Sequence, residues 1–160
     1  MTQAQAVPVE DAAELTLFIE RRYHARHRQQ LPHLVKLAAM IEDIHAGDAG
    51  LPAGLSLLLQ RMGQEMEMHM RKEEMILFPA IRRGGMPGIE HPIAVMRADH
   101  EGHADDLSAI RSLTRDFTLP EGACSSWQTL YRDLAEFTED LGEHMRLENE
   151  VLFPQFETAR

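Results

Sequence analysis

Two near-copies of one short motif hold the residues most suited to metal chemistry. HMRKEEMILFP begins at His69 and HMRLENEVLFP begins at His144, and the two are identical at seven of eleven positions. Each copy places a glutamate, Glu73 or Glu148, four residues after its histidine. At this spacing the two side chains share one helix face, about 6 Å apart along the axis. An imidazole above a carboxylate is a typical ligand pair for a metal ion.

The elements that must position these pairs are four amphipathic helices. Apolar residues recur at helical spacing over four segments, at about 12–45, 55–78, 93–114 and 127–153. Segments rich in glycine and proline separate them. Four long helices with short loops predict an all-α fold, an antiparallel up-down-up-down four-helix bundle. Pro32 is expected to kink or interrupt the first helix, and Pro79 and Pro154 are expected to end the second and fourth.

The chain also repeats itself as two helix pairs. The motif copies lie 75 residues apart, and His24 and His100 lie 76 apart. We expect one domain over 1–160, with halves at about 10–80 and 91–155. In such a bundle the first and third helices begin at the end where the second and fourth helices finish. His24 and His100 lie a few turns after their helices begin, and His69 and His144 lie a few turns before their helices end, so all four histidines lie at the same depth. The predicted metal ligands in this single layer are His24, His69, Glu73, His100, His144 and Glu148.

The donor set predicts the kind of metal site. Ionised carboxylates in an apolar core are costly unless a cation or another partner neutralises them. Six nitrogen and oxygen donors are too many for one tetrahedral zinc ion. Two ions bridged by the two glutamates, with two histidines each, fit better, and the four imidazoles favour iron over manganese or magnesium. We therefore expect two iron ions as the cofactor.

Two polar residues near this layer are predicted to have other roles. Glu65 lies one turn before His69 and is expected on the inner face. There it would either line a route for water, protons or ions, or pair with Arg61. His103 could turn inward, but one histidine from each helix already completes the symmetric set. Ligand roles are likewise not expected for the remaining histidines at His27, His33 and His91.

His45 and Cys124 are expected to lie away from the layer. His45 follows His24 by 21 residues, roughly 31 Å along a straight helix, so the two cannot reach one cluster. We interpret His45 as a core or capping histidine near the first loop. Cys124 precedes the fourth helix and is expected to pack rather than to do redox chemistry.

Composition excludes several classes of protein. The formal net charge is −10, which disfavours nucleic acid as a partner. One cysteine excludes a disulfide scaffold and fits a reducing compartment. The first residues do not resemble a signal peptide, and no apolar run approaches the roughly 18 residues of a membrane span. We expect a cytoplasmic protein without a membrane partner.

These residues make the chain resemble the hemerythrin-like cation-binding domain, a four-helix bundle with His-x3-Glu on helices two and four. The segments YHARHRQQLPHLVKLAAMIEDIH, ADHEGH and GACSSWQTLYRDL are similar to the repair-of-iron-centres family. The resemblance covers about 23–153. It implies the same six ligands with bridging glutamates, and inner carboxylates at Glu65 and at Asp99. Asp99 is shorter than the family's side chain, so a channel role there is less strongly implied.

The resemblance also implies a function. Its members are di-iron proteins of the nitrosative and oxidative stress response. We therefore expect a non-haem di-iron protein that binds nitric oxide or oxygen species and donates iron to damaged iron–sulfur clusters. Expected partners are iron–sulfur proteins or an electron donor. If the chain turns over, it would be a nitric-oxide-reductase-like oxidoreductase.

Two departures limit what the resemblance implies. Family members have an additional N-terminal domain with a cysteine pair, and this sequence starts at the bundle, so thiol-dependent steps are not expected from it. Oxygen-carrying hemerythrins resemble the chain in fold but use a further histidine where it has Ala104. A hemerythrin-like oxygen- or iron-binding or sensing module without turnover is the alternative function.

Overall fold

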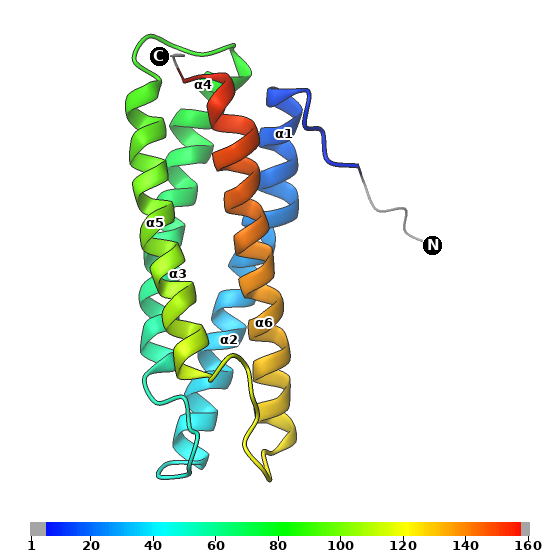
Figure 1. Cartoon of the computed structure of the whole chain (residues 1–160). Coiled ribbons are helices and arrows are strands. Elements are labelled where there is room, and N and C mark those ends of the chain that lie inside the picture. The colour runs from blue at the N-terminus through cyan, green and yellow to red at the C-terminus, as the bar shows by residue number, and fades with distance from the viewer. Residues whose placement is uncertain (1–5, 158–160) are drawn as a thin grey trace.

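The four amphipathic segments form four helical rods in the computed structural model, which describes residues 6–157 (Figure 1). The first rod consists of α1 (Ala12–Ile19), a π-helical turn η1 (Glu20–His24) and α2 (Ala25–Ile44). The second consists of α3 (Leu55–Lys72), the π turn η2 (Glu73–Leu77) and α4 (Phe78–Arg82). The third is α5 (Glu90–Leu113). The fourth consists of α6 (Ser125–Arg146), the π turn η3 (Leu147–Leu152) and the 3-10 turn η4 (Phe153–Gln155).

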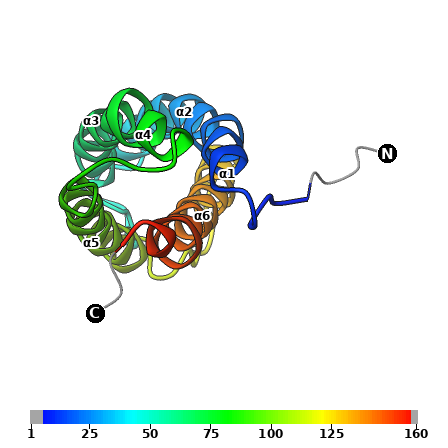
Figure 2. The ribbon, with the colours of Figure 1, turned by 90° about the horizontal axis from the view of Figure 1, so that it is seen from above.

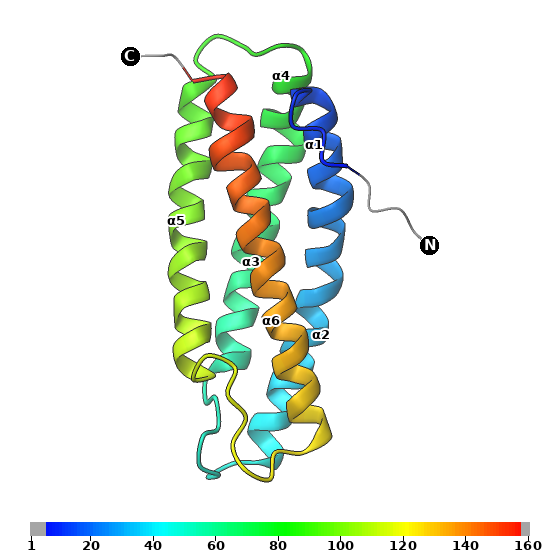
Figure 3. The same ribbon diagram turned by 45° about the vertical axis from the view of Figure 1, so that its right-hand side comes forward.

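The rods run up and down in sequence order. Seen from above, α2, α3, α5 and α6 follow one another around the bundle, so each rod lies beside the next one in the chain (Figure 2). The α2–α3 and α5–α6 connections lie at one end, and the α4–α5 connection lies at the other (Figure 3). The predicted all-α, antiparallel four-helix bundle is confirmed.

Three of the four rods contain a π-helical turn, which the periodicity of the sequence did not predict. The turns include His24, Glu73 and Glu148, each a predicted ligand. A π turn fits one extra residue into a helical turn, and such turns are frequent at functional sites. Each turn therefore changes which residues face inward on the far side of a predicted ligand.

The π turn after α3 changes which residues face inward beyond Glu73. In a regular α-helix Ile76 would lie on the inward face three residues after Glu73, but it is 56% exposed, whereas Leu77 is 1% exposed. The extra residue of the wide turn rotates the chain beyond Glu73 and brings Leu77 inward instead. Pro79 does not end the helix, because it lies in the first turn of α4, where a missing N–H breaks no hydrogen bond of that helix.

Pro32 does not interrupt the first rod, contrary to one of the two outcomes expected there. α2 continues through it from Ala25 to Ile44. Leu31 and Leu34 on either side remain buried in the core, and this packing offsets the one backbone hydrogen bond that proline removes.

The apolar interior consists of two separate clusters, which lie on either side of the predicted ligands along the bundle. One cluster joins α2, α3, α5 and α6 toward the end with two loops and includes Leu34, Met62 and Phe137. The other joins α1, α4, the start of α5 and the end of the fourth rod, and it includes Leu15 and Ile93. A polar layer therefore divides the interior.

His45 and Cys124 lie at the end of the bundle with two loops. His45 is the C-cap residue of α2, and its ring packs against Trp127 at a centroid distance of 4.9 Å. Its Nε2 lies 3.2 Å from Cys124 Sγ, and Cys124 packs against the first apolar cluster. This agrees with the capping and packing roles expected from the sequence. Among the described residues, no helix combines the length and apolarity of a membrane span.

Candidate metal centre

The six predicted ligands come together in the polar layer. Their exposure is 0% for His24, Glu73 and Glu148, and 2% or 3% for His69, His100 and His144. His24 and His144 face each other with ring centroids 5.1 Å apart, and His69 and His100 do the same at 4.9 Å. Side chains from four separate rods therefore reach one depth of the bundle.

The six residues form two overlapping groups. The donor atoms of His24, Glu73, His144 and Glu148 all lie within 4.8 Å of one another, and so do those of His69, Glu73, His100 and Glu148. Each group contains two histidines, and both contain the same two glutamates. This arrangement could hold two metal ions side by side, with the two carboxylates between them.

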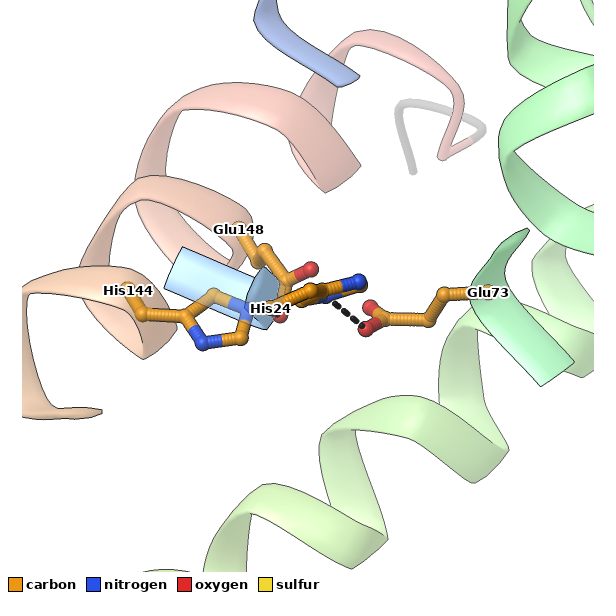
Figure 4. Close-up of side chains that lie close together, drawn as sticks. All are labelled: His24, Glu73, His144 and Glu148. Carbon is orange, nitrogen blue, oxygen red and sulfur yellow. Dashed lines mark ion pairs between the residues drawn. The ribbon is translucent and has the colours of Figure 1, made fainter. Parts of the chain in front are cut away.

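The carboxylates face the Nε2 atoms of the histidines. Glu73 Oε1 lies 3.2 Å from Nε2 of both His24 and His69. Glu148 Oε1 lies 2.9 Å from Nε2 of His100 and 3.2 Å from that of His144. Figure 4 shows the first group, in which His144 and Glu148 from the fourth rod point toward His24 from the first rod and Glu73 from the second.

The donor atoms lack the partners that buried polar atoms usually have. Among the residues that the structure describes, none forms a hydrogen bond of acceptable geometry with these buried atoms: both oxygens of Glu73, both oxygens of Glu148, and Nε2 of His24 and His144. Most buried polar atoms in folded proteins are paired, and an unpaired carboxylate is especially costly. A cation between the carboxylates would meet this need, so the residues fit a bound metal pair.

Proximity drives apart the pKa values of the two glutamates. Burial, followed by repulsion from Glu148, raises the pKa of Glu73 well above its usual range. Burial also acts to raise the pKa of Glu148, but His144, Glu73 and His100 outweigh it and hold that pKa well below the usual range. Without a cation, the pair therefore tends to retain one proton that two isolated glutamates would have lost. Binding of a cation would release this proton.

Every one of the four histidines has a partner for its other ring nitrogen. The Nδ1 atoms lie close to an atom of a neighbouring rod: His24 to Glu74 Oε2 at 2.8 Å, His69 to Asp99 Oδ2 at 3.0 Å, His100 to Asn149 Oδ1 at 2.7 Å, and His144 to His27 Nε2 at 3.1 Å. When Nδ1–H donates to such a partner, Nε2 keeps its lone pair for the centre. All four rings are thus arranged to ligate through Nε2.

A chain of hydrogen bonds defines the tautomer of His144. The Gln30 amide oxygen can only accept, so His27 Nδ1, at 3.2 Å, must donate to it. Burial lowers the pKa of His27 to about 3, so its ring is neutral and its Nε2 accepts from His144 Nδ1. His144 Nε2 is then free of hydrogen and faces Glu148.

The Leu-Phe-Pro end of each motif also supports the centre. Phe78 stacks on His24 with an interplanar angle of 13°, and Phe153 stacks on His100 at 11°. Both phenylalanines are fully buried. The motif therefore repeats because each copy supplies a histidine, a glutamate, a partner for a histidine of another rod, and an aromatic ring that holds that histidine in place.

Glu65 is not on the inner face, contrary to the prediction. Its side chain is 49% exposed and receives a hydrogen bond from Arg61 at 3.3 Å. Four residues rotate a helix about 40° beyond one full turn. Met66, 1% exposed, takes the inward position instead. Glu65 still lines a surface pocket with Asp99, whose carboxylate contacts His69.

The sequence interpretation overlooked the residues around the ligands. Glu74 and Asn149 directly follow the motif glutamates and occupy equivalent positions in the two repeats. Arg28 donates to both oxygens of Glu74, at 2.8 and 2.9 Å. The hydrogen bond from His24, together with Arg28, lowers the pKa of Glu74 to about 2. The repeat was the signal that could have identified this pair.

Comparisons with known proteins agree with this architecture. The profile of the family described as "Hemerythrin HHE cation binding domain" matches residues 17–156. The "Iron-sulfur cluster repair protein YtfE" of Edwardsiella ictaluri is 46% identical over 142 residues, 89% of this chain and 64% of that protein. The protein of the same name from Yersinia pseudotuberculosis serotype O:1b is 45% identical over 141 residues, 88% of this chain and 64% of that protein.

These matches confirm the resemblance predicted from the sequence, although the chain spans less than two thirds of the length of these relatives. The matched family profile covers all six residues of the candidate centre. The chain therefore belongs to the hemerythrin HHE cation binding domain family.

Proposed function

We propose that the chain is a non-haem di-iron protein in which His24 and His144 hold one iron ion and His69 and His100 hold the other. Glu73 and Glu148 bridge the two ions. The observation that supports this most directly is the pair of fully buried carboxylates, whose four oxygens have no hydrogen-bond partner in the described part of the chain. Two divalent ions would neutralise both groups and use the four Nε2 atoms that face them.

Iron is the ion that best fits this donor set. The two groups of donors include no thiolate, and each combines two imidazoles with two carboxylates. Mixed imidazole and carboxylate ligands suit iron, whereas magnesium and calcium prefer oxygen alone. The proposed domain extends over 1–160, with the ligands distributed between its two helix-pair halves.

We further propose that the centre binds nitric oxide or dioxygen and contributes to the repair of iron–sulfur clusters. The relatives named as iron–sulfur cluster repair proteins support this role. Bound iron would supply the redox chemistry and the open coordination positions for a small ligand. One turn after His100, the position of a further histidine in oxygen carriers, this chain has Ala104, which is exposed. Two histidines per ion leave room for such a ligand.

The chain's own residues would prepare the site. The Nδ1 partners hold the imidazoles with Nε2 inward. Phe78 and Phe153 shield the layer on one side, and Met66 and Leu141 line it on the other. The pair of Glu73 and Glu148 would give up its retained proton when iron binds. We place this protein in the cytoplasm, where a single unpaired cysteine remains reduced, with iron–sulfur proteins and an electron donor as partners.

Metal analysis followed by nitric oxide titration tests the proposal. Protein loaded with ferrous iron under anaerobic conditions should contain two iron ions per chain after desalting, and the reduced form should bind nitric oxide. With an added electron donor to re-reduce the iron, consumption of nitric oxide in many-fold excess over protein would identify an enzyme. Stoichiometric uptake with transfer of iron to a damaged cluster would identify a donor. Iron content below one per chain would contradict the di-iron assignment.

A further inference from the structure

His103 is buried beside the candidate centre. It is 4% exposed, and within residues 6–157 neither of its ring nitrogens has a hydrogen bond. Its ring lies 5.3 Å from that of His69, yet it belongs to neither group of central donors. Leaving a buried polar group unpaired costs about 1–3 kcal/mol. This cost calls for an explanation that the central site does not provide.

The internal repeat underlines how unusual His103 is. His103 follows His100 by three residues, as His27 follows His24. His27 uses both ring nitrogens, one toward Gln30 and the other toward His144. In the other half of the repeat, the carboxylate of Asp99 accepts the hydrogen bond from His69 Nδ1. His103 is therefore not needed to orient a ligand of the centre.

Two carboxylates lie next to the free imidazole. Glu65 on α3 and Asp106 on α5 each offer an oxygen, and these oxygens and a nitrogen of His103 all lie within 4.8 Å of one another. His103 and Asp106 are three residues apart and so share a face of α5. Asp106 is 6% exposed, whereas Glu65 is half exposed at the surface. The cluster thus extends from the interior to solvent.

We propose that Glu65, His103 and Asp106 form a third, mononuclear binding site for a divalent transition-metal cation, outside the central pair. One imidazole and two carboxylates suit Fe²⁺, Zn²⁺, Co²⁺ or Mn²⁺, whereas magnesium and calcium rarely use imidazole. The site does not depend on which ions the central residues hold. It remains a distinct site even if the proposed function is wrong.

A pocket gives a cation access to this site. Its volume is about 260 Å³, and its lining includes Glu65, His69, Asp99, Gly102 and His103. A Cβ added at Gly102 would meet no atom within 4 Å, so the backbone leaves this side of the pocket open. A cation in the pocket would lie between solvent and His69, a proposed ligand of the centre.

Arg61 determines how tightly the cation binds. Its guanidinium donates to Asp106 at 2.8 Å and to Glu65 at 3.3 Å, and it is itself half exposed. A metal ion must displace this arginine to use both carboxylates. The site is therefore expected to be weaker than the central pair, and loss of Arg61 should strengthen it.

Zinc titration of the iron-loaded protein tests the proposal. In equilibrium dialysis against Zn²⁺ at pH 7, wild-type protein should bind one zinc ion beyond its central metals, with iron content unchanged. His103→Ala and Asp106→Asn should each weaken this uptake by about tenfold or more, because each removes a ligand. Arg61→Gln should increase the affinity. His33→Ala, which alters an exposed histidine paired with Asp133, serves as the matched control and should change nothing.

Three outcomes would overturn the third site. The first is equal zinc uptake by wild type, His103→Ala and Asp106→Asn. The second is a loss of central iron in His103→Ala, which would make His103 a ligand of the centre. The third is weaker binding in Arg61→Gln. If the central di-iron assignment fails instead, additional zinc will enter the central residues, and that uptake will persist in His103→Ala. Circular dichroism of each variant should match that of the wild type, which will establish that the variant is folded.

Discussion

His27 Nε2 lies 3.1 Å from His144 Nδ1, so one buried histidine orients another. The other three histidines of the centre each have an oxygen as the Nδ1 partner. A ring nitrogen can accept from His144 only while His27 is neutral, and Gln30 together with deep burial keeps it in the required tautomer. A relay of two hydrogen bonds, from His144 to His27 and from His27 to Gln30, therefore holds His144 in place.

Replacement of His27 by alanine should weaken metal binding without removing a ligand. Loss of an outer partner of a ligating histidine typically lowers metal affinity about 10- to 100-fold. We expect an effect of this size, measured by competition with a chelator, while the fully loaded variant still contains the wild-type amount of metal. His33→Ala on the same helix is exposed and serves as the control. Unchanged affinity in His27→Ala would show that the relay has no orienting role.

Replacement of either buried glutamate should affect metal content itself. Glu73→Gln and Glu148→Gln each remove one of the two carboxylates shared by both groups of donors. We expect well below two iron ions per chain in each variant by elemental analysis. His45→Ala, at the far end of the bundle, should retain the wild-type content. Full retention of iron in both glutamine variants would refute the bridging assignment, and loss in His45→Ala would contradict the predicted depth of the layer.

The stacked phenylalanines should stabilise the fold and hold the ligands. Phe153 is fully buried and stacks on His100. Phe153→Ala should lower the free energy of unfolding by about 3–5 kcal/mol and speed the release of metal to a chelator. Phe156→Ala, a partly exposed neighbour, is the control and should lose less stability. Equal rates of metal release in the two variants would show that the stacked ring does not hold its histidine.

Acid should destabilise the metal-free protein at mild pH. Burial lowers the pKa of His27 to about 3 and those of His69 and His103 to about 4, from an ordinary value of 6.5. Below pH 6.5 the unfolded chain takes up protons that the folded chain does not, so the free energy of unfolding decreases as the pH is lowered. Each ring contributes up to about 1.4 kcal/mol per pH unit until its folded pKa is reached. Two raised pKa values act in the opposite direction: that of His100, which Glu148 maintains against the effect of burial, and that of Glu73, which burial and repulsion from Glu148 raise.

Urea unfolding at pH 7 and pH 5 measures this dependence. Metal-free wild type should be less stable at pH 5. His103→Gln has no imidazole to titrate at the position least involved in the centre, and it should show a smaller difference between the two pH values. An equal difference in the two proteins would mean that His103 titrates similarly in the folded and unfolded chains.

The sequence was sufficient to predict the bundle and to select the six residues that meet in its polar layer. The prediction used only regular helix geometry, through the four-residue spacing within each motif and the repeat of helix pairs. α3, α5 and α6 are regular α-helices over most of the length that matters here. The outward position of Glu65 follows from the same regular geometry, which favours Met66 for the inner face. The position of Ile76 does not. Ile76 turns outward because a π turn adds a residue, and apolar periodicity does not reveal such turns.

The partners of the ligands were also beyond prediction from periodicity. His27, Glu74 and Asn149 reach the centre through side-chain contacts between rods. Such contacts depend on the rotation of each rod about its own axis to within a fraction of a turn. A helical pattern in sequence indicates which broad face is buried, but it does not distinguish a ligand from the residue that orients it.

The polar layer divides the apolar interior into two separately packed clusters. Between them lie two buried glutamates that retain a proton until a cation joins them. Metal would thus act as a crosslink midway along the bundle, fastening one end of the molecule to the other. With metal bound, the two apolar clusters would unfold together in one cooperative transition. Without metal, each cluster would unfold more independently of the other.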